Sequence, residues 1–312
     1  MEFELDLTWL KSWLAVVDAG GFARAADRIY LSQPRVSAHV ANLERSLGCT
    51  LIDRKARPLT LTDDGQRFLP RARAILASVD DAVSELHSTD ATVVGRVSLA
   101  SFASASSEFV PGVIAAMHET YPGIQMAVLD LDVDVIDATL IERRAPVALR
   151  PYRPEPTDRT LIRRGLWREP FVVLAPVGHE LLKGKEIELE RIARYPVITI
   201  GDPFASQSLG YEAWTGMHDR QLVPYLGMVS HQPTTLAAMV RAGHGIGLLN
   251  LLAARMVRTE GLEIRPIANP AVFRDVGIWW HEREPLSRAA QAFIDFAIAA
   301  DRPEGTGPPE FE

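Results

Sequence analysis

The sequence of 312 residues has little of what marks secreted, membrane and metal-binding proteins. Its one cysteine, Cys49, excludes a disulfide framework within the chain, and no two histidines have the HxxxH spacing of a metal site, so we expect no bound metal. No apolar run reaches the ~18 residues of a membrane-spanning helix. The first residues, MEFELDLTWL, lack the basic segment and the cleavage site of a signal peptide. We therefore expect a protein of the cytoplasm that contacts no membrane.

The motifs of the common catalytic and nucleotide-binding folds are also missing. The sequence contains no G-x-S-x-G, no P-loop and no G-x-G-x-x-G directly after a predicted strand. Its nearest glycine cluster, GHGIG at 243–247, precedes a strand rather than a helix. A phosphate-binding loop needs a helix N-terminus directly behind its glycines. We therefore expect neither enzymatic activity nor a cofactor.

Charge is unevenly distributed along the chain. The net charge of −7 argues by itself against a nucleic-acid-binding protein. Between residues 20 and 57, however, seven basic residues accompany three acidic ones, which leaves a local excess of four positive charges. A basic cluster at one end of an acidic chain is typical of a regulator with one DNA-facing domain. The basic residues are Arg24, Arg28, Arg35, Arg45, Arg54, Lys55 and Arg57.

The first 62 residues have the pattern of three short helices and a hairpin. Apolar residues recur at helical spacing over 10–17 and 22–29, and Gly20-Gly21 separates the two stretches. A third helix is expected over 32–48, with Ser32 as its N-cap. This is the order of a helix-turn-helix, whose second helix enters the major groove. Residues 51–62, LIDRKARPLTLT, place two short apolar segments around a basic tip, which predicts a β-hairpin wing.

A long amphipathic helix and an α/β region follow. From Asp63 to about His87, apolar residues recur at nearly the 3.5-residue period of a coiled coil, so we expect a second copy of the chain to cover this stripe. Residues 63–95 are therefore predicted to be a linker helix and a hinge. Short β-rich runs then alternate with helical stretches, which predicts an α/β domain with mostly parallel sheets over 96–300. Residues 301–312 are rich in proline, glycine and acidic residues and predict a disordered tail.

Residues 21–69, GFARAADRIYLSQPRVSAHVANLERSLGCTLIDRKARPLTLTDDGQRFL, resemble the LysR-type transcriptional regulators. The Ala-Ala pair, Ser-Gln-Pro, Leu-Glu, Leu-Gly and Leu-Thr-x-x-Gly come in the order of that family. A weaker resemblance continues in YPGIQM, LIRRGLWREPFVVLAPVGHEL and LAAMVRAGHGIGLL, so that about residues 5–300 are covered.

The resemblance implies a fold and a function for each part of the chain. Residues 1–62 would form a winged helix-turn-helix, and residues 96–300 an effector-binding domain similar to periplasmic solute-binding proteins. That domain would hold a ligand cleft between subdomain I (96–164 and 267–300) and subdomain II (165–266). A homodimer through the linker helix, and a tetramer built from it, are also implied. The chain would be a sequence-specific DNA-binding transcriptional regulator under the control of a small molecule. The alternative is a constitutive DNA-binding protein without a ligand, which leaves ~200 residues of α/β domain unexplained.

Two groups of residues are candidates for contact with operator DNA. The first lies on the exposed side or at the start of the third helix, where glutamine and arginine can pair bidentately with adenine and guanine edges. The second lies in the wing, where cations suit phosphates or a narrow minor groove. The alternative is a solvated helix face and a wing that serves solubility. The candidates are Gln33, Pro34, Arg35 and Ser37 in the helix, and Arg54 and Arg57 in the wing.

Candidates for the effector site come from the ends of predicted strands. SFASASSEF at 101–109 follows a strand and opens a helix, so its N–H groups and hydroxyls could hold an anion. Arg150 ends a strand that faces the expected cleft and could pair with a carboxylate. We therefore expect an anionic effector, most simply a carboxylate-bearing metabolite. The alternatives are helix capping for the serines and a surface ion pair for Arg150. The candidates are Ser101, Ser104, Arg150, Thr199, Gly201, Asp202 and His231.

Overall fold

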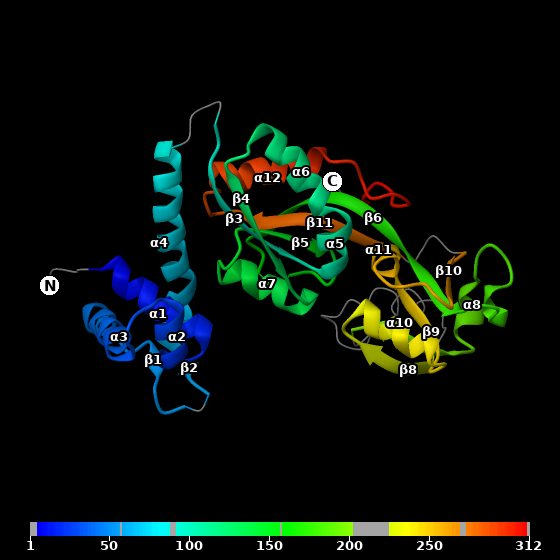
Figure 1. Cartoon of the computed structure of the whole chain (residues 1–312), viewed down its shortest axis with the longest axis horizontal. Helices are drawn as coiled ribbons and strands as arrows, with labels where there is room; N and C mark the ends of the chain where they lie inside the picture. Colours follow the sequence, from blue (N-terminus) through cyan, green and yellow to red (C-terminus); the bar gives the residue numbers. More distant parts are fainter. Residues whose placement is uncertain are drawn as a thin grey trace. The chain divides into compact units, whose positions relative to one another are not determined.

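A computed structural model of the chain describes residues 5–56, 58–87, 92–156, 158–201, 225–268 and 273–310. These residues form two compact units, one built mainly from residues 1–89 and the other from residues 90–140 and 145–312 (Figure 1). Among the described residues, no helix combines the length and the apolar character that crossing a bilayer requires.

The N-terminal unit is a winged helix-turn-helix followed by a long helix, as predicted. Asp6 begins the first helix by accepting a hydrogen bond from the Thr8 N–H at 2.6 Å. Gly20 and Gly48 end the first and third helices in the left-handed conformation, with φ of 64° and 69°. The two wing strands pair in antiparallel fashion. The elements are α1 (Leu7–Ala19), α2 (Phe22–Arg28), α3 (Gln33–Leu47), β1 (Ile52–Asp53), β2 (Thr60–Leu61) and α4 (Asp63–His87).

The first half of α4 belongs to the core of this unit. Trp13 is fully buried, and its ring centroid lies 5.4 Å from that of Phe68 on α4. Ala72, one turn further along, is also fully buried. At the start of α4, a Cβ added at Gly65 would lie 2.1 Å from the carbonyl oxygen of Leu51, so this close approach of two backbones requires glycine. The winged helix-turn-helix formed by α1, α2, α3, β1 and β2, called the head below, therefore folds as one body with the beginning of α4.

The first sheet of the C-terminal unit has the strand order β4-β3-β5-β11-β6. Its second strand, β3, pairs in parallel with β4 and β5, whereas β11 is antiparallel to both β5 and β6. Helices α6 and α12 lie on one side of this sheet and α7 on the other (Figure 1). The elements are β3 (Gly95–Ser101), α5 (Ala103–Glu108), α6 (Val110–Thr120), β4 (Ile124–Asp130), α7 (Val133–Ile141), β5 (Val147–Pro151), β6 (Leu161–Pro176), β11 (Phe273–His281) and α12 (Arg288–Ala299).

The second sheet shares β6 with the first. Its β7 pairs in parallel with β8 and β9, and the second half of β6 is antiparallel to β9 and β10. The predicted two-subdomain α/β fold is confirmed, but its sheets are less parallel than expected, because β6, β10 and β11 all pair in the antiparallel sense. The elements are a 3-10 helix (Glu180–Leu182), α8 (Leu189–Ile192), β7 (Pro196–Ile200), β8 (Tyr225–Ser230), α10 (Pro233–Arg241), β9 (Ile246–Asn250), α11 (Leu251–Arg255) and β10 (Leu262–Pro266).

The chain passes between the two sheets later than the predicted Arg164–Gly165. Pro170 is the last residue of β6 that pairs with β11, and Phe171 is the first that pairs with β9. The boundary therefore falls inside one continuous strand of 16 residues, with no loop to mark it in the sequence. The return passage falls between the end of β10 at Pro266 and the start of β11 at Phe273.

The C-terminal segment packs along β6, which corrects the disordered tail predicted for 301–312. Gly307 forms an antiparallel bridge with Arg168, with N···O distances of 2.8 and 2.9 Å. Glu310 adds an ion pair to the Arg168 side chain. Because β9 joins β6 only from Phe171 onward, the edge of β6 at Arg168 would otherwise be open, and the tail covers it. Residues 311 and 312 lie outside the described residues.

Candidate DNA-binding surface and effector pocket

The predicted base-reading residues lie together on α3. Gln33, Pro34 and Arg35 are exposed at its first turn, and Ser37 is half-buried beside them. The opposite face of α3 is fully buried through Val36, Val40 and Leu43. Within the described part of the chain, the side chains of Gln33 and Arg35 make no hydrogen bond or ion pair. The start of α3 therefore presents polar groups that remain available to a partner.

Glu44 of α3 organises the wing. Its Oε1 accepts the backbone N–H groups of Leu51 and Ile52 at 2.8 and 3.2 Å, and its Oε2 lies 3.0 Å from Nη2 of Arg54. The Arg54 guanidinium also lies over the Phe22 ring, 5.5 Å from its centroid. These contacts hold Arg54 in place while 47% of its side chain stays exposed, which suits a phosphate contact. Arg57, the other wing candidate, lies outside the described residues.

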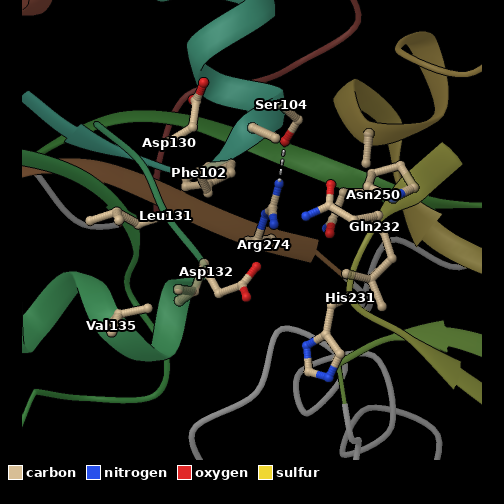
Figure 2. A pocket seen from close by; sticks show the side chains of 15 residues that line it. Phe102, Ser104, Asp130, Leu131, Asp132, Val135, His231, Gln232, Asn250 and Arg274 are labelled. Atoms are coloured by element: carbon tan, nitrogen blue, oxygen red, sulfur yellow. Dashed lines mark hydrogen bonds between the residues drawn. The ribbon is translucent and has the colours of Figure 1, made fainter. Parts of the chain in front are cut away.

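A cavity of about 490 Å³ lies between the two subdomains of the C-terminal unit. It opens where strands of both subdomains reach their carboxyl ends, which is the usual position of a ligand in an α/β sheet. Figure 2 shows the side chains that line it. Subdomain I contributes Phe102, Ala103, Ser104, Asp130, Leu131, Asp132, Val133, Val135 and Arg274, and subdomain II contributes Ile200, His231, Gln232, Pro233, Asn250 and Ala253.

The structure brings only part of the predicted effector set to this cavity. Ser104 and His231 line it. Ser101 and Thr199 are buried outside its lining, where their hydroxyls donate to the carbonyl oxygens of Phe102 at 3.4 Å and of Gly201 at 3.0 Å. Gly201 is also not part of the lining: it has a φ of 73° and donates its N–H to the carbonyl oxygen of Ser230 at 2.7 Å. Asp202 lies outside the described residues.

Arg150 does not line the cavity, which corrects its predicted role in the cleft. Its side chain is 1% exposed, and its Nε lies 2.8 Å from Oδ1 of Asp137 on α7. It also donates to the carbonyl oxygen of Pro154 at 2.7 Å and lies over the Trp279 ring. Burial raises the pKa of the Asp137 carboxyl, and the charge of Arg150 only partly offsets this. Its contacts with Asp137 and Pro154 therefore hold Arg150 outside the lining of the cavity.

We expect Arg150→Ala to destabilise the protein rather than to change effector binding selectively. The substitution leaves the Asp137 carboxylate partly buried without its counter-charge, a loss of about 3 kcal/mol in the free energy of unfolding. Urea unfolding followed by circular dichroism measures it. The double variant Arg150→Ala/Asp137→Ala is the control and should regain part of that loss. An Arg150→Ala protein with wild-type stability and no effector response would contradict this assignment.

Among the described residues, the arginine that lines the cavity is Arg274, which no sequence pattern had indicated. Arg274 and Glu169 are 1% and 0% exposed and form an ion pair across β11 and β6, with Nε 2.8 Å from Oε1. Oε2 of Glu169 accepts the backbone N–H of Leu252 from subdomain II at 3.2 Å. On the subdomain I side, the Arg274 guanidinium lies 3.5 Å from the Ser104 hydroxyl and over the Phe102 ring. The pair therefore touches both subdomains.

Four further polar side chains of the lining were also missed: Asp130, Asp132, Gln232 and Asn250. Asp132 and Asn250 come directly at or after the ends of β4 and β9, and Gln232 follows β8. Asn250 is 3% exposed, and its Nδ2 has no hydrogen-bond partner among the described residues. The carboxyl ends of the predicted strands IQMAVLDL and GIGLL were visible in the sequence, so the rule that ligands bind there would have pointed to Asp132 and Asn250.

Two family models cover nearly all of the chain. The model described as "Bacterial regulatory helix-turn-helix protein, lysR family" matches residues 7–66, and the model described as "LysR substrate binding domain" matches residues 90–302. They correspond to the winged helix-turn-helix and to the two-subdomain α/β unit described above, respectively. The second model alone spans well over half of the chain.

Relatives and solved structures agree with these models. The uncharacterized HTH-type transcriptional regulators YnfL and YbhD of Escherichia coli are 28% and 25% identical to this chain, covering 91% and 94% of it and 96% and 91% of their own lengths. Full-length OxyR from Pseudomonas aeruginosa has a TM-score of 0.69 at 21% identity and covers 96% of this chain and 99% of its own. Full-length CbnR in complex with its target DNA has a TM-score of 0.68 at 20% identity, covering 94% and 99%. The two structures share the fold, and the family models identify the chain as a member of the LysR family of bacterial helix-turn-helix transcriptional regulators.

Proposed function

We propose that this LysR-family regulator binds a specific operator through α3 and the wing, and that a small molecule in the cavity between the subdomains changes this binding. The observation that carries the proposal is the cavity itself. It takes its lining from the strand ends of both subdomains, so a molecule held there contacts both. Ligand binding between two subdomains biases their relative angle. A regulator that acts without a ligand does not require such a cavity, which weighs against the alternative of a constitutive DNA-binding protein.

On the DNA side, the roles of the candidates differ. Gln33 and Arg35 would read base edges, with Pro34 and Ser37 beside them at the start of α3. Arg54 of the wing would neutralise a phosphate, which adds affinity without sequence preference, and the same role is proposed for Arg57 from its position in the sequence alone. Gln33 and Arg35 are exposed, and their side chains make no hydrogen bond or ion pair in the described part of the chain, which supports this division.

The substitutions Arg35→Ala and Arg54→Ala form a matched test of these roles. An operator is first recovered by selection from a pool of random duplexes. We expect Arg35→Ala to lose ~1–3 kcal/mol of binding free energy at one operator position and to leave affinity for random duplex nearly unchanged. Arg54→Ala should weaken both and lower the salt slope by about one. Equal losses on operator and random duplex for Arg35→Ala would assign it to the phosphates instead.

The effector is proposed to carry a carboxylate. Hydrogen-bond donors in the cavity support this: the hydroxyl of Ser104 and the amide groups of Asn250 and Gln232. Arg274 is already neutralised by Glu169, so these neutral donors would supply most of the recognition. A thermal-shift screen of small carboxylic acids, followed by DNA binding with each stabilising compound, tests it. Stabilisation without any change in DNA binding would remove the regulatory role of the cavity.

The assembly is proposed to be a dimer through α4, with a tetramer built from two such dimers. The second half of α4 supports this, because Val83 and Leu86 have exposed fractions of 51% and 84%. Large apolar side chains on a surface helix at near-heptad spacing are typical of a coiled-coil seam. Two heads tied in this way would bind paired half-sites.

A further inference from the structure

We propose that the effector also carries a protonated amine, which Asp132 binds, while the amide of Asn250 on the opposite wall donates to the carboxylate. The ligand class is therefore a small zwitterion of the amino-acid type. The inference rests on the proposed function, since it names the chemistry of the molecule that the same cavity takes.

The charges of the cavity argue first for a cationic group. The positive charge of Arg274 is neutralised by Glu169, a fully buried carboxylate whose Oε1 lies 2.8 Å from Nε of Arg274. The lining then retains the carboxylates of Asp130 and Asp132, and among the described residues neither has an ion-pair partner. A ligand with only negative charge would be repelled by a carboxylate that faces the cavity, whereas an ammonium group would be attracted.

The directions of the side chains separate the two acids. Figure 2 shows the Asp132 carboxylate turned toward Arg274 and the interior of the cavity, whereas the Asp130 carboxylate turns away from it. Asp132 lies just before α7, at the end of the segment that follows β4. Asp132 is therefore the acid that an amine in the cavity would meet.

The Asn250 amide gives an independent indication that a polar ligand is bound. Asn250 is 3% exposed, and its Nδ2 has no hydrogen-bond partner in the described part of the chain. A buried donor without an acceptor is costly, so most such groups in proteins have a bound partner. Figure 2 shows the Asn250 and Gln232 side chains extending from subdomain II toward Arg274, across the cavity from Asp132. An acceptor of the ligand, most simply a carboxylate oxygen, satisfies this donor.

The two groups stand on different subdomains, so that a zwitterion would bridge them. Asp132 belongs to subdomain I and Asn250 to subdomain II. The volume of about 490 Å³ suits a small polar molecule. An acid without an amine would satisfy Asn250 but would leave Asp132 facing a like charge. This asymmetry makes the amine a determinant of specificity.

The test compares matched compounds on the full-length protein. The probes are the common L-amino acids, each with its deaminated carboxylic acid and its decarboxylated amine. We expect at least one amino acid to raise Tm, and its deaminated acid to bind about 10- to 100-fold more weakly. Isothermal titration calorimetry gives the affinities.

Three variants locate the effect. Asp132→Asn should weaken the amino acid about 10- to 100-fold and bring its affinity close to that of the deaminated acid, whereas Asn250→Ala should weaken both compounds. Glu119→Gln makes the same charge change on an exposed position of α6 and should leave both affinities unchanged. If the deaminated acid binds wild type as tightly as the amino acid, the amine inference fails while the carboxylate effector stands. If only the decarboxylated amines bind, the carboxylate proposal and the Asn250 role both fail. If no compound of the panel raises Tm, the zwitterion class is excluded.

Discussion

Charging the exposed end of α4 with Val83→Asp/Leu86→Asp is expected to break the dimer and to lower operator affinity by about 10²–10⁴-fold. Two heads held by one seam bind the second half-site at a high effective concentration, and this gain disappears in a monomer. Val83 and Leu86 are 51% and 84% exposed, so aspartate costs the isolated chain little. In a seam, each new carboxylate would be desolvated next to apolar side chains.

Sedimentation velocity measures the mass, and binding to duplexes with one or two half-sites measures the avidity. The control is Ser78→Asp, an exposed position about 140° around the helix from Val83 at 3.6 residues per turn. It should keep the wild-type mass and affinity. A Val83→Asp/Leu86→Asp protein that remains dimeric would place the interface elsewhere. A monomer that binds both duplexes as the wild type does would show that one head is enough.

The choice of Val83 and Leu86 depends on a feature of α4 that periodicity alone does not reveal. The apolar stripe from Phe68 onward reads as one seam in the sequence. In the structure Phe68 and Ile75 pack against the core of the head, and Ala72 is fully buried in it. The stripe therefore serves two partners in succession, first the head and then, by our proposal, a second copy. The period of the apolar residues shows that one face of the helix is apolar, but it does not show what covers that face.

Local patterns predicted the helices and the hairpin of the N-terminal unit well because the contacts that begin and end these elements are short in sequence. The caps, the turn glycines and the hairpin all involve residues close along the chain. The link from Glu44 to the wing spans at most ten residues. The motif residues of this unit contact residues close to them in the sequence, so the motif alone is enough to predict the local structure.

The lining of the cavity was harder to predict because its residues come from distant segments. The pattern at PVALR identified a strand but did not show what packs against it. Arg150 is buried and pairs with Asp137 of α7 instead of being available to a ligand. Glu169 and Arg274 are 105 residues apart, and no local pattern links them. Strand ends were the one usable signal, because they mark the ligand edge of a sheet whatever their partners are.

The buried pair of Glu169 and Arg274 is expected to give the largest loss of stability from a single substitution. Arg274→Met keeps most of the side-chain volume but leaves the Glu169 carboxylate, at 0% exposure, with the Leu252 N–H at 3.2 Å as its one remaining hydrogen-bond donor among the described residues. Removing one partner of such a pair costs about 3–5 kcal/mol, because an uncompensated charge stays buried. Glu169→Leu should cost a similar amount for the opposite charge.

The double variant Arg274→Met/Glu169→Leu distinguishes this explanation from simple loss of packing. With both charges removed, neither desolvation penalty remains, so we expect the double variant to be more stable than either single variant. Urea unfolding of the four proteins closes the cycle. The recovery should be incomplete, because the Leu252 N–H loses its acceptor and the Ser104 hydroxyl loses its contact with the guanidinium at 3.5 Å. Losses that simply add would mean that the two side chains stabilise the domain independently of each other.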